Sequence, residues 1–184
     1  MRPLWKAKAQ TIMTSKITTS QTIGPFPHEA WNWAVELTAK VDSAAPQITV
    51  KGCIFDGKGE PINDAWAEAW MPDSAALESA HAIPGYRRVP SGDDGGFTLQ
   101  ITQAQNVGDG KPAAYITVFA RGLVKHQFTA IFLEDDPALA QSAILNQVPA
   151  SRRDTLIARK QADGSYLWNI NMQGAEETVF FDYI

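Results

Sequence analysis

Short segments in which side-chain polarity alternates at every second residue run along the chain, and this pattern limits the fold more than any other feature. The clearest is PAAYITVFARG at 112–122, where Ile116 and Val118 fall on one face and Tyr115 and Thr117 on the other. A period of two with β-branched and aromatic residues is typical of a strand with one face in the core. Tyr115 is therefore first interpreted as a packing residue.

Further segments show a comparable pattern, and glycine, proline or aspartate separates most of them. They lie at 47–56, 65–70, 91–102 with its leading turn, 126–135, 154–160, 165–173 and 177–183. Short turns at 161–164 and 174–176 join the last three segments and predict an antiparallel meander. No alternation of strands with long helices and no internal repeat competes. The sequence therefore predicts an all-β fold, an antiparallel β-sandwich.

Other parts of the chain do not read as strands. Residues 71–90 lack periodicity and predict a long loop, which is uncommon unless the loop is functional. Short helices are predicted in the N-terminal region and at 137–147, where Asp135 or Asp136 precedes Pro137 and can cap the helix. In AWAEAW the alternation predicts a face of alanines that can lie close against another layer, formed by Ala65, Ala67 and Ala69.

Length and composition indicate one globular domain. The chain has 184 residues, of which 45% are hydrophobic and 20% charged. We expect residues 1–12 to be an extension or a start-site artefact, because Met13 is a second methionine, followed by an N-terminal arm at 13–46 and the sandwich at 47–184.

Charge and cysteine content exclude several classes of protein. A net charge of −4 without a basic block argues against a surface for nucleic acid or anionic membrane. Cys53 is the only cysteine, so no intrachain disulfide can form, which fits a reducing compartment. No apolar run approaches the ~18 residues of a membrane span, and the N-terminus lacks the apolar region of a signal peptide. We therefore expect a soluble, cytoplasmic protein.

The residues alone show no catalytic constellation. His28, His81 and His126 are far apart in the sequence and are interpreted as surface or packing residues. There is no zinc cluster, phosphate-binding loop or nucleophile elbow, and the acidic clusters fall at turns and caps. This reasoning ends at a stand-alone β-sandwich that binds or assembles without catalysis. That hypothesis stays open, as does a metal site of an unfamiliar kind in this chain.

Four long segments resemble the intradiol ring-cleaving dioxygenases, and within that family the α rather than the iron-bearing β subunits. They span most of residues 20–183 and read SQTIGPF, VKGCIFDGKGEPINDAWAEAW, ITVFARGLVKHQFTAIFLEDD and RRDTLIARKQADGSYLWNINMQGAEETVFFDY. The resemblance implies part of an Fe(III)-dependent enzyme that cleaves protocatechuate or a related acidic catechol with O2 to a muconate. It also implies an α-β hetero-oligomer, in which the arm at 13–46 lies against the partner subunit.

The resemblance implies that this chain carries no metal. In the family, two tyrosines and two histidines hold the iron, and the matching positions here are Glu78, Val107, Ala113 and Tyr115. Alanine and valine have no donor atom, and Glu78 and Tyr115 alone could not hold ferric iron. A homologous β subunit is therefore expected to hold Fe(III).

The resemblance also implies which residues of this chain face the substrate in the partner's site. They are Thr22, Gly24, Pro25 and Phe26 of the N-terminal loop, together with Ala130. Ala130 replaces an arginine that reaches for the substrate carboxylate, and an arginine makes paired, charge-assisted bonds to such a group. Its loss predicts a different or bulkier acidic substituent, such as the sulfonate of 4-sulfocatechol. Alternatively, Arg121, Lys125 or a residue of the β subunit supplies the missing charge.

Overall fold

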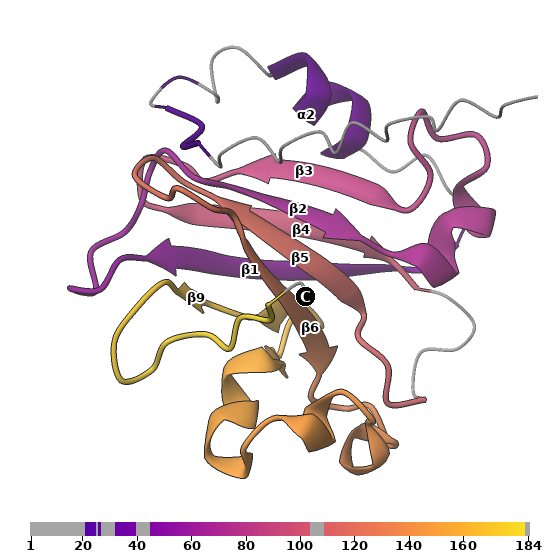
Figure 1. Cartoon of the computed structure of the whole chain (residues 1–184). Coiled ribbons are helices and arrows are strands. Elements are labelled where there is room, and N and C mark those ends of the chain that lie inside the picture. Colours follow the sequence, from indigo (N-terminus) through magenta and orange to yellow (C-terminus); the bar gives the residue numbers. More distant parts are fainter. Residues whose placement is uncertain (1–20, 25, 27–31, 40–44, 104–108, 183–184) are drawn as a thin grey trace, which may run out of the picture.

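The computed structural model describes residues 21–24, 26, 32–39, 45–103 and 109–182, and every structural statement below concerns these residues. They form one α-helix, α2 (Asn32–Ala39), and nine strands (Figure 1). The strands are β1 (Gln47–Phe55), β2 (Trp66–Trp70), β3 (Tyr86–Pro90), β4 (Gly96–Thr102), β5 (Ala114–Phe119), β6 (Gln127–Leu133), β7 (Ile157–Lys160), β8 (Tyr166–Leu167) and β9 (Ile170–Asn171). Four short 3-10 helices complete the set: η1 (Pro72–Glu78), η2 (Leu139–Gln141), η3 (Leu145–Gln147) and η4 (Ala150–Leu156).

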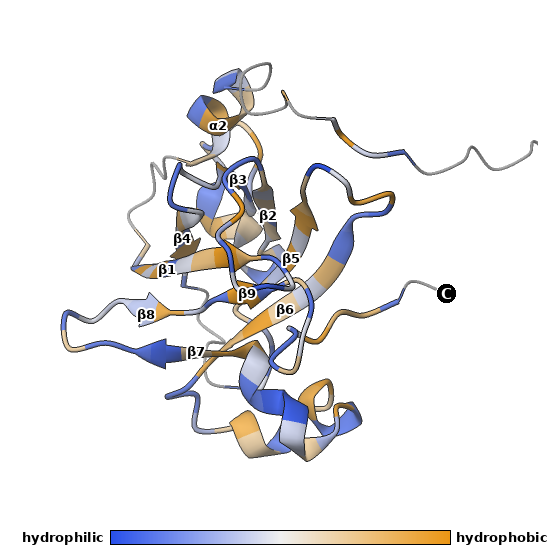
Figure 2. Cartoon of the chain, turned by 90° about the vertical axis from the view of Figure 1, so that its left-hand side faces the viewer, coloured by the Kyte–Doolittle hydropathy of each residue, from blue (hydrophilic) through white to orange (hydrophobic). Residues whose placement is uncertain are grey.

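The strands pair in the order β3-β2-β5-β6-β7-β8-β1-β4, with β9 also on β1. The prediction of an all-β fold is confirmed, but the sheet is mixed and the prediction of strictly antiparallel pairing is wrong. The turn at 161–164 does close the antiparallel β7-β8 hairpin, as expected. That hairpin lies between β6 and β1, however, and pairs with each of them in parallel, as β9 does with β1. Figure 2 shows the hairpin as a largely hydrophilic ribbon that projects from the sheet.

No strand forms in 177–182, the described part of the predicted C-terminal strand. Within 178–182 the chain makes two isolated backbone bonds, from the Thr178 N–H to the Asn171 carbonyl and from the Phe181 N–H to the Phe128 carbonyl. The tail therefore crosses from β9 to β6 and does not extend a meander. The apolar residues of this segment do not indicate whether it pairs as a strand or packs as an irregular tail.

The connection at 71–90 and the segment at 137–147 also differ from expectation. The first contains η1 and the edge strand β3. Helix α2 covers this edge, and its Thr38 hydroxyl accepts a hydrogen bond from the Arg88 N–H at 2.9 Å. The second contains the single turns η2 and η3 in place of one longer helix. The carboxylate of Asp136 accepts from the Ala138 N–H at 2.8 Å in the turn before η2. The N-cap of η2 is Ala138, which makes no side-chain cap bond, so the predicted capping role is wrong.

The main core draws on all nine strands. Ile116 and Val118 of β5 are at most 1% exposed, and the alanine face of 65–69 is equally buried, so both predicted faces are confirmed. Gly52 allows the closest approach, since a Cβ atom there would lie 1.8 Å from the Trp168 carbonyl oxygen. A second apolar cluster lies beneath η3 and the C-terminal tail and contains Ala130, Phe132, Leu145, Val148 and Leu156. None of the described helices is long and apolar enough to cross a membrane.

Candidate functional site

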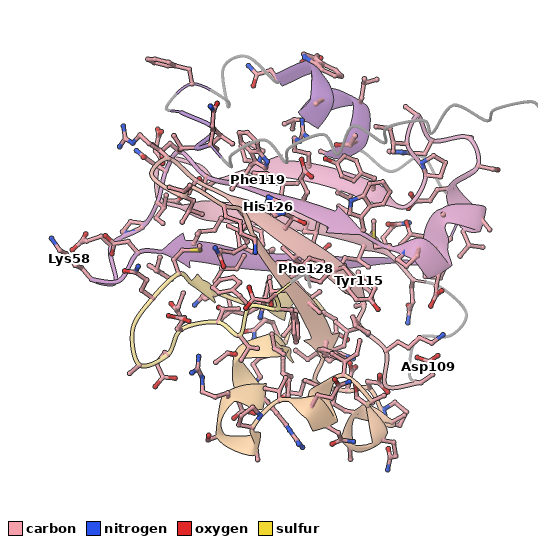
Figure 3. The ribbon with its side chains drawn as sticks, in the orientation of Figure 1. Lys58, Asp109, Tyr115, Phe119, His126 and Phe128 are labelled. Atoms are coloured by element: carbon pink, nitrogen blue, oxygen red, sulfur yellow. The ribbon has the colours of Figure 1, made fainter. Side chains whose placement is uncertain are left out.

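The outer face of the β5-β6 hairpin carries Tyr115 and Ala130, two of the residues that the sequence singled out. Tyr115 is the register partner of Ala130, and Thr117 is the partner of Phe128. The ring of Tyr115 stacks on that of Phe128 with centroids 6.0 Å apart and planes 9° from parallel. Figure 3 shows these rings, with those of Phe119 and His126, along the two strands. The side chain of Tyr115 is thus a packing partner on a half-buried aromatic face.

A groove of about 490 Å³ opens over Ala130 on this face. Ala130 is 1% exposed and forms part of its floor. The other lining residues are Tyr115, Phe128, Ile144, Gln147, Val148, Pro149, Val179 and Phe181. None of these described residues carries a charge, so the groove offers no cation to a carboxylate.

The N-terminal loop lies at the other end of β5. The Thr22 hydroxyl accepts a hydrogen bond from the Gly122 N–H at 3.2 Å, which ties the loop to the β5-β6 connection. Gly24 has φ of +77°, a conformation that favours glycine, and the Phe26 side chain is 63% exposed. Pro25 lies outside the described residues. The structure therefore does not bring the loop and Ala130 into one pocket of this chain.

A small pocket of about 220 Å³ lies between the loop and the hairpin tip. Its described lining consists of Gln21, Ile23, Phe119, Ala120, Leu123, Val124, Lys125 and His126. The His126 ring packs against Phe119 with centroids 5.3 Å apart. His81 is also a packing residue, since its ring bonds the backbone of Ile83. The interpretation of these two histidines is confirmed, and His28 lies outside the described residues.

Of the four positions matched to iron ligands, Glu78 has become part of a buried ion pair. Its carboxylate and the Arg87 guanidinium form a two-point salt bridge with no exposed side-chain surface, one of whose bonds measures 2.9 Å. The Thr102 hydroxyl and the Gly85 N–H donate to the same carboxylate, the latter at 2.8 Å. Four donors, two from Arg87 of β3, one from Thr102 of β4 and one from the Gly85 loop, thus occupy it completely.

The electrostatics of this pair keep the Glu78 carboxylate charged. Burial pushes the pKa of Glu78 upward, but the hydrogen bonds from Arg87, Thr102 and Gly85 and the guanidinium charge outweigh it. The net effect is a pKa below the ordinary value. A carboxylate so engaged is not available to a metal ion.

The other matched positions offer even less to ferric iron. Ala113 has no donor atom, and Tyr115 offers one phenol oxygen beside a cavity of about 230 Å³ that Ala113 also lines. Val107 lies outside the described residues. Across the part of the chain that the structure describes, no three His, Cys, Asp or Glu side chains come together as a possible metal site. The residues present here do not fit the iron that the family resemblance implies.

Sequence reasoning missed the partners that hold Glu78. Arg87 stands in the segment taken for a loop, and the alternation in Tyr86–Pro90 is hidden because the buried face carries an arginine. The only available signal was the pair of arginines in a short segment that ends at a proline. Two neighbouring arginines do not indicate that Arg87 pairs with Glu78, nine residues earlier in the chain.

Comparisons with known proteins give the family of the chain. No protein-family model matches it. The protocatechuate 3,4-dioxygenase alpha chain of Burkholderia cepacia is 32% identical over 195 residues, which cover 92% of this chain and 98% of that protein. The alpha chain of Pseudomonas putida is 33% identical over 198 residues, covering 90% and 96%.

Solved structures agree on the fold. The dioxygenase domain of a carbohydrate-binding fusion protein from Streptomyces aligns with a TM-score of 0.53 at 17% identity, covering 76% of this chain and 86% of that domain. At this identity the likeness shows the fold alone. The two relatives are 32% and 33% identical to this chain over nearly their whole length. The chain therefore belongs to the protocatechuate 3,4-dioxygenase alpha-chain family of intradiol dioxygenases.

Proposed function

We propose that this chain is the non-iron-binding subunit of a heteromeric intradiol dioxygenase, and that a homologous β subunit holds Fe(III). The observation that carries the proposal is the buried Glu78-Arg87 pair. One former ligand position is bound to a guanidinium, and Ala113 offers no donor atom. The chain therefore contributes to its enzyme by shape, burial and contact with a partner.

The reaction we propose is the cleavage of protocatechuate or a related acidic catechol by O2. The bond between the two hydroxyl-bearing carbons breaks, and both oxygen atoms enter the product, a muconate. The ferric ion of the partner would supply Lewis acidity and a template for the catecholate. The part of this chain would be to wall the site with the loop at Thr22–Phe26 and to exclude water.

The test is to express the chain alone and together with its β-like neighbour, and to measure iron, visible absorption and O2 consumption. We expect no iron and no tyrosinate-to-iron colour in the isolated chain. The co-purified complex is expected to show both, with O2 uptake in the presence of protocatechuate. One iron per isolated chain would overturn the proposal in favour of a metal site in this chain. A monodisperse chain that captures no partner would support the stand-alone β-sandwich.

We further propose that the substrate substituent is not restricted to a carboxylate, because Ala130 sits in a groove without charge. Protocatechuate, 4-sulfocatechol and unsubstituted catechol should be compared by steady-state kinetics on the complex. We expect turnover of both acidic catechols. An arginine at this position would give a strong preference for protocatechuate. The same preference in the wild-type complex would contradict this part of the proposal. The variant Ala130→Arg supplies that reference in the same complex.

A further inference from the structure

The pocket at the hairpin tip has the size and walls for one substituted ring. Its volume of about 220 Å³ exceeds the roughly 150 Å³ of an apolar cavity that holds benzene. Ile23, Phe119 and Leu123 provide apolar walls, and Gln21 and Lys125 provide polar groups. The Thr22–Gly122 hydrogen bond fixes the loop that forms one side. An aromatic group with a polar end would be matched by this arrangement.

The charges of the pocket select an anion. Lys125 is the only lysine or arginine among the described lining residues, and no aspartate or glutamate lies among them. Among the described residues the ammonium has one acidic neighbour, Asp182, at 3.7 Å, with 51% and 92% of the two side chains exposed. An exposed pair at that distance is weak and screened by salt. A ligand anion that enters the pocket can therefore replace Asp182.

Arg121, the other cation of the β5-β6 connection, pairs with an acidic side chain outside the pocket. Arg121 bonds Asp64 through its Nε at 3.0 Å, with 63% of the Arg121 side chain and 13% of the Asp64 side chain exposed. Arg121 does not line the pocket. Of the two cations in the β5-β6 connection, only Lys125 lines the pocket beside the N-terminal loop.

We infer that Lys125 binds the anionic ring substituent of the substrate, an aromatic acid, at the tip of the β5-β6 hairpin. This inference rests on the proposed function and adds a specificity residue to it. A lysine presents a compact charge on a flexible stem, whereas an arginine presents a planar fork matched to a carboxylate. Lys125 is therefore expected to accept a carboxylate and a sulfonate with similar ease, which gives the broader substrate preference a physical cause.

The test compares the co-purified complex with its Lys125→Gln variant on protocatechuate, 4-sulfocatechol and catechol. We expect KM to rise about tenfold for both anions, the effect of one charge-assisted hydrogen bond, with little change in kcat or in the kinetics of catechol. Lys58→Gln is the matched control, since Lys58 is an exposed lysine in the connection after β1 (Figure 3). Arg121→Gln tests the competing cation. Equal effects on all three substrates, or the anion effect in Arg121→Gln alone, would overturn the assignment.

Failure of the inference can be separated from failure of the proposed function. An inactive wild-type complex overturns the function, and calorimetric titration with 4-hydroxybenzoate and benzyl alcohol then decides the role of Lys125 without turnover. Binding of the acid that falls about tenfold in Lys125→Gln supports the assignment. Unchanged binding, or no binding by the wild type, rejects it. Matching unfolding curves for the two proteins confirm that the substitution acts on binding alone.

Discussion

Glu78 and Lys125 each carry one charge, in two regions of the chain that surround that charge differently. Four donors enclose Glu78, and neither it nor Arg87 has exposed side-chain surface. Lys125 is half exposed, and its acidic neighbour lies at 3.7 Å on a side chain that is almost fully exposed. The first region satisfies its charge internally and links η1, β3 and β4. The second region leaves its charge available to a ligand. We therefore place the ligand contact at the hairpin tip and not at Glu78, although Glu78 matches an iron-ligand position of the family.

The largest expected effect comes from breaking the enclosed pair. Glu78→Ala leaves the Arg87 guanidinium buried without its counter-ion, and we expect a loss of about 3–5 kcal/mol in the free energy of unfolding. Urea unfolding followed by fluorescence measures it. The double variant Glu78→Leu/Arg87→Met should recover most of the loss, because it removes both charges together. A loss below about 1 kcal/mol in the single variant would mean that the pair contributes no more than a surface contact.

Acid should destabilise the protein through the same pair, but by less than Glu78→Ala does. Protonation of Glu78 removes its charge and leaves the shape of its side chain unchanged. The folded-state pKa of Glu78 lies below its ordinary value of 4.5, so its contribution is complete above that pH. The contribution is lost as the pH falls through the folded-state pKa. The difference in unfolding free energy between the wild type and Glu78→Gln should therefore shrink below pH 4.5. A difference that stays constant from pH 7 to pH 3 would contradict the lowered pKa.

At the open region, one hydrogen bond between described residues ties the loop to the hairpin tip. Thr22→Val removes the acceptor of the Gly122 N–H, and we expect a cost of about 0.5–1.5 kcal/mol. Amide exchange of Gly122 should become faster while amides in β5 keep their protection. Thr22→Ser, which retains the hydroxyl, serves as the control. Equal exchange in all three proteins would show that the loop is held by other contacts.

The smallest effect is expected for an ordinary surface pair. Arg159 lies 3.1 Å from Glu134 and 3.3 Å from Asp154, with 46%, 42% and 79% of the three side chains exposed. Arg159→Ala should change the free energy of unfolding by no more than about 1 kcal/mol, and salt should reduce that change further. Urea unfolding at low and high salt provides the measurement. A loss as large as that of Glu78→Ala would remove the distinction between enclosed and exposed charges.

The sequence predicted those parts of the fold that depend on local alternation. The two faces of β5 and the alanine face at 65–69 could be assigned because burial repeats every second residue there. The strand at Tyr86–Pro90 was hidden, since the fully buried residue on its inner face is Arg87. Arg87 is compatible with the core because Glu78 neutralises its charge, and local pattern carries no information about that partner.

Pairing and the site were predictable to different degrees. Periodicity indicates that a strand exists but not which neighbour it takes, so the parallel pairing of β7, β8 and β9 could not be foreseen. At the site, the sequence with its family resemblance selected the loop and left Arg121, Lys125 or a partner residue as sources of charge. Geometry separates the first two, because Asp64 holds Arg121 and the pocket beside the loop is lined by Lys125.

The position of β1 has a consequence for the synthesis of this protein. β1 pairs with β4 on one edge, but its other edge is closed by β8 and β9, at Tyr166 to Asn171. A ribosome must therefore complete most of the chain before that edge is covered, and closing such a long loop is slow. Until then the nascent chain exposes an unpaired strand that other chains can extend. We expect a chain that stops before residue 166 to aggregate, even though it contains the residues of the first seven strands.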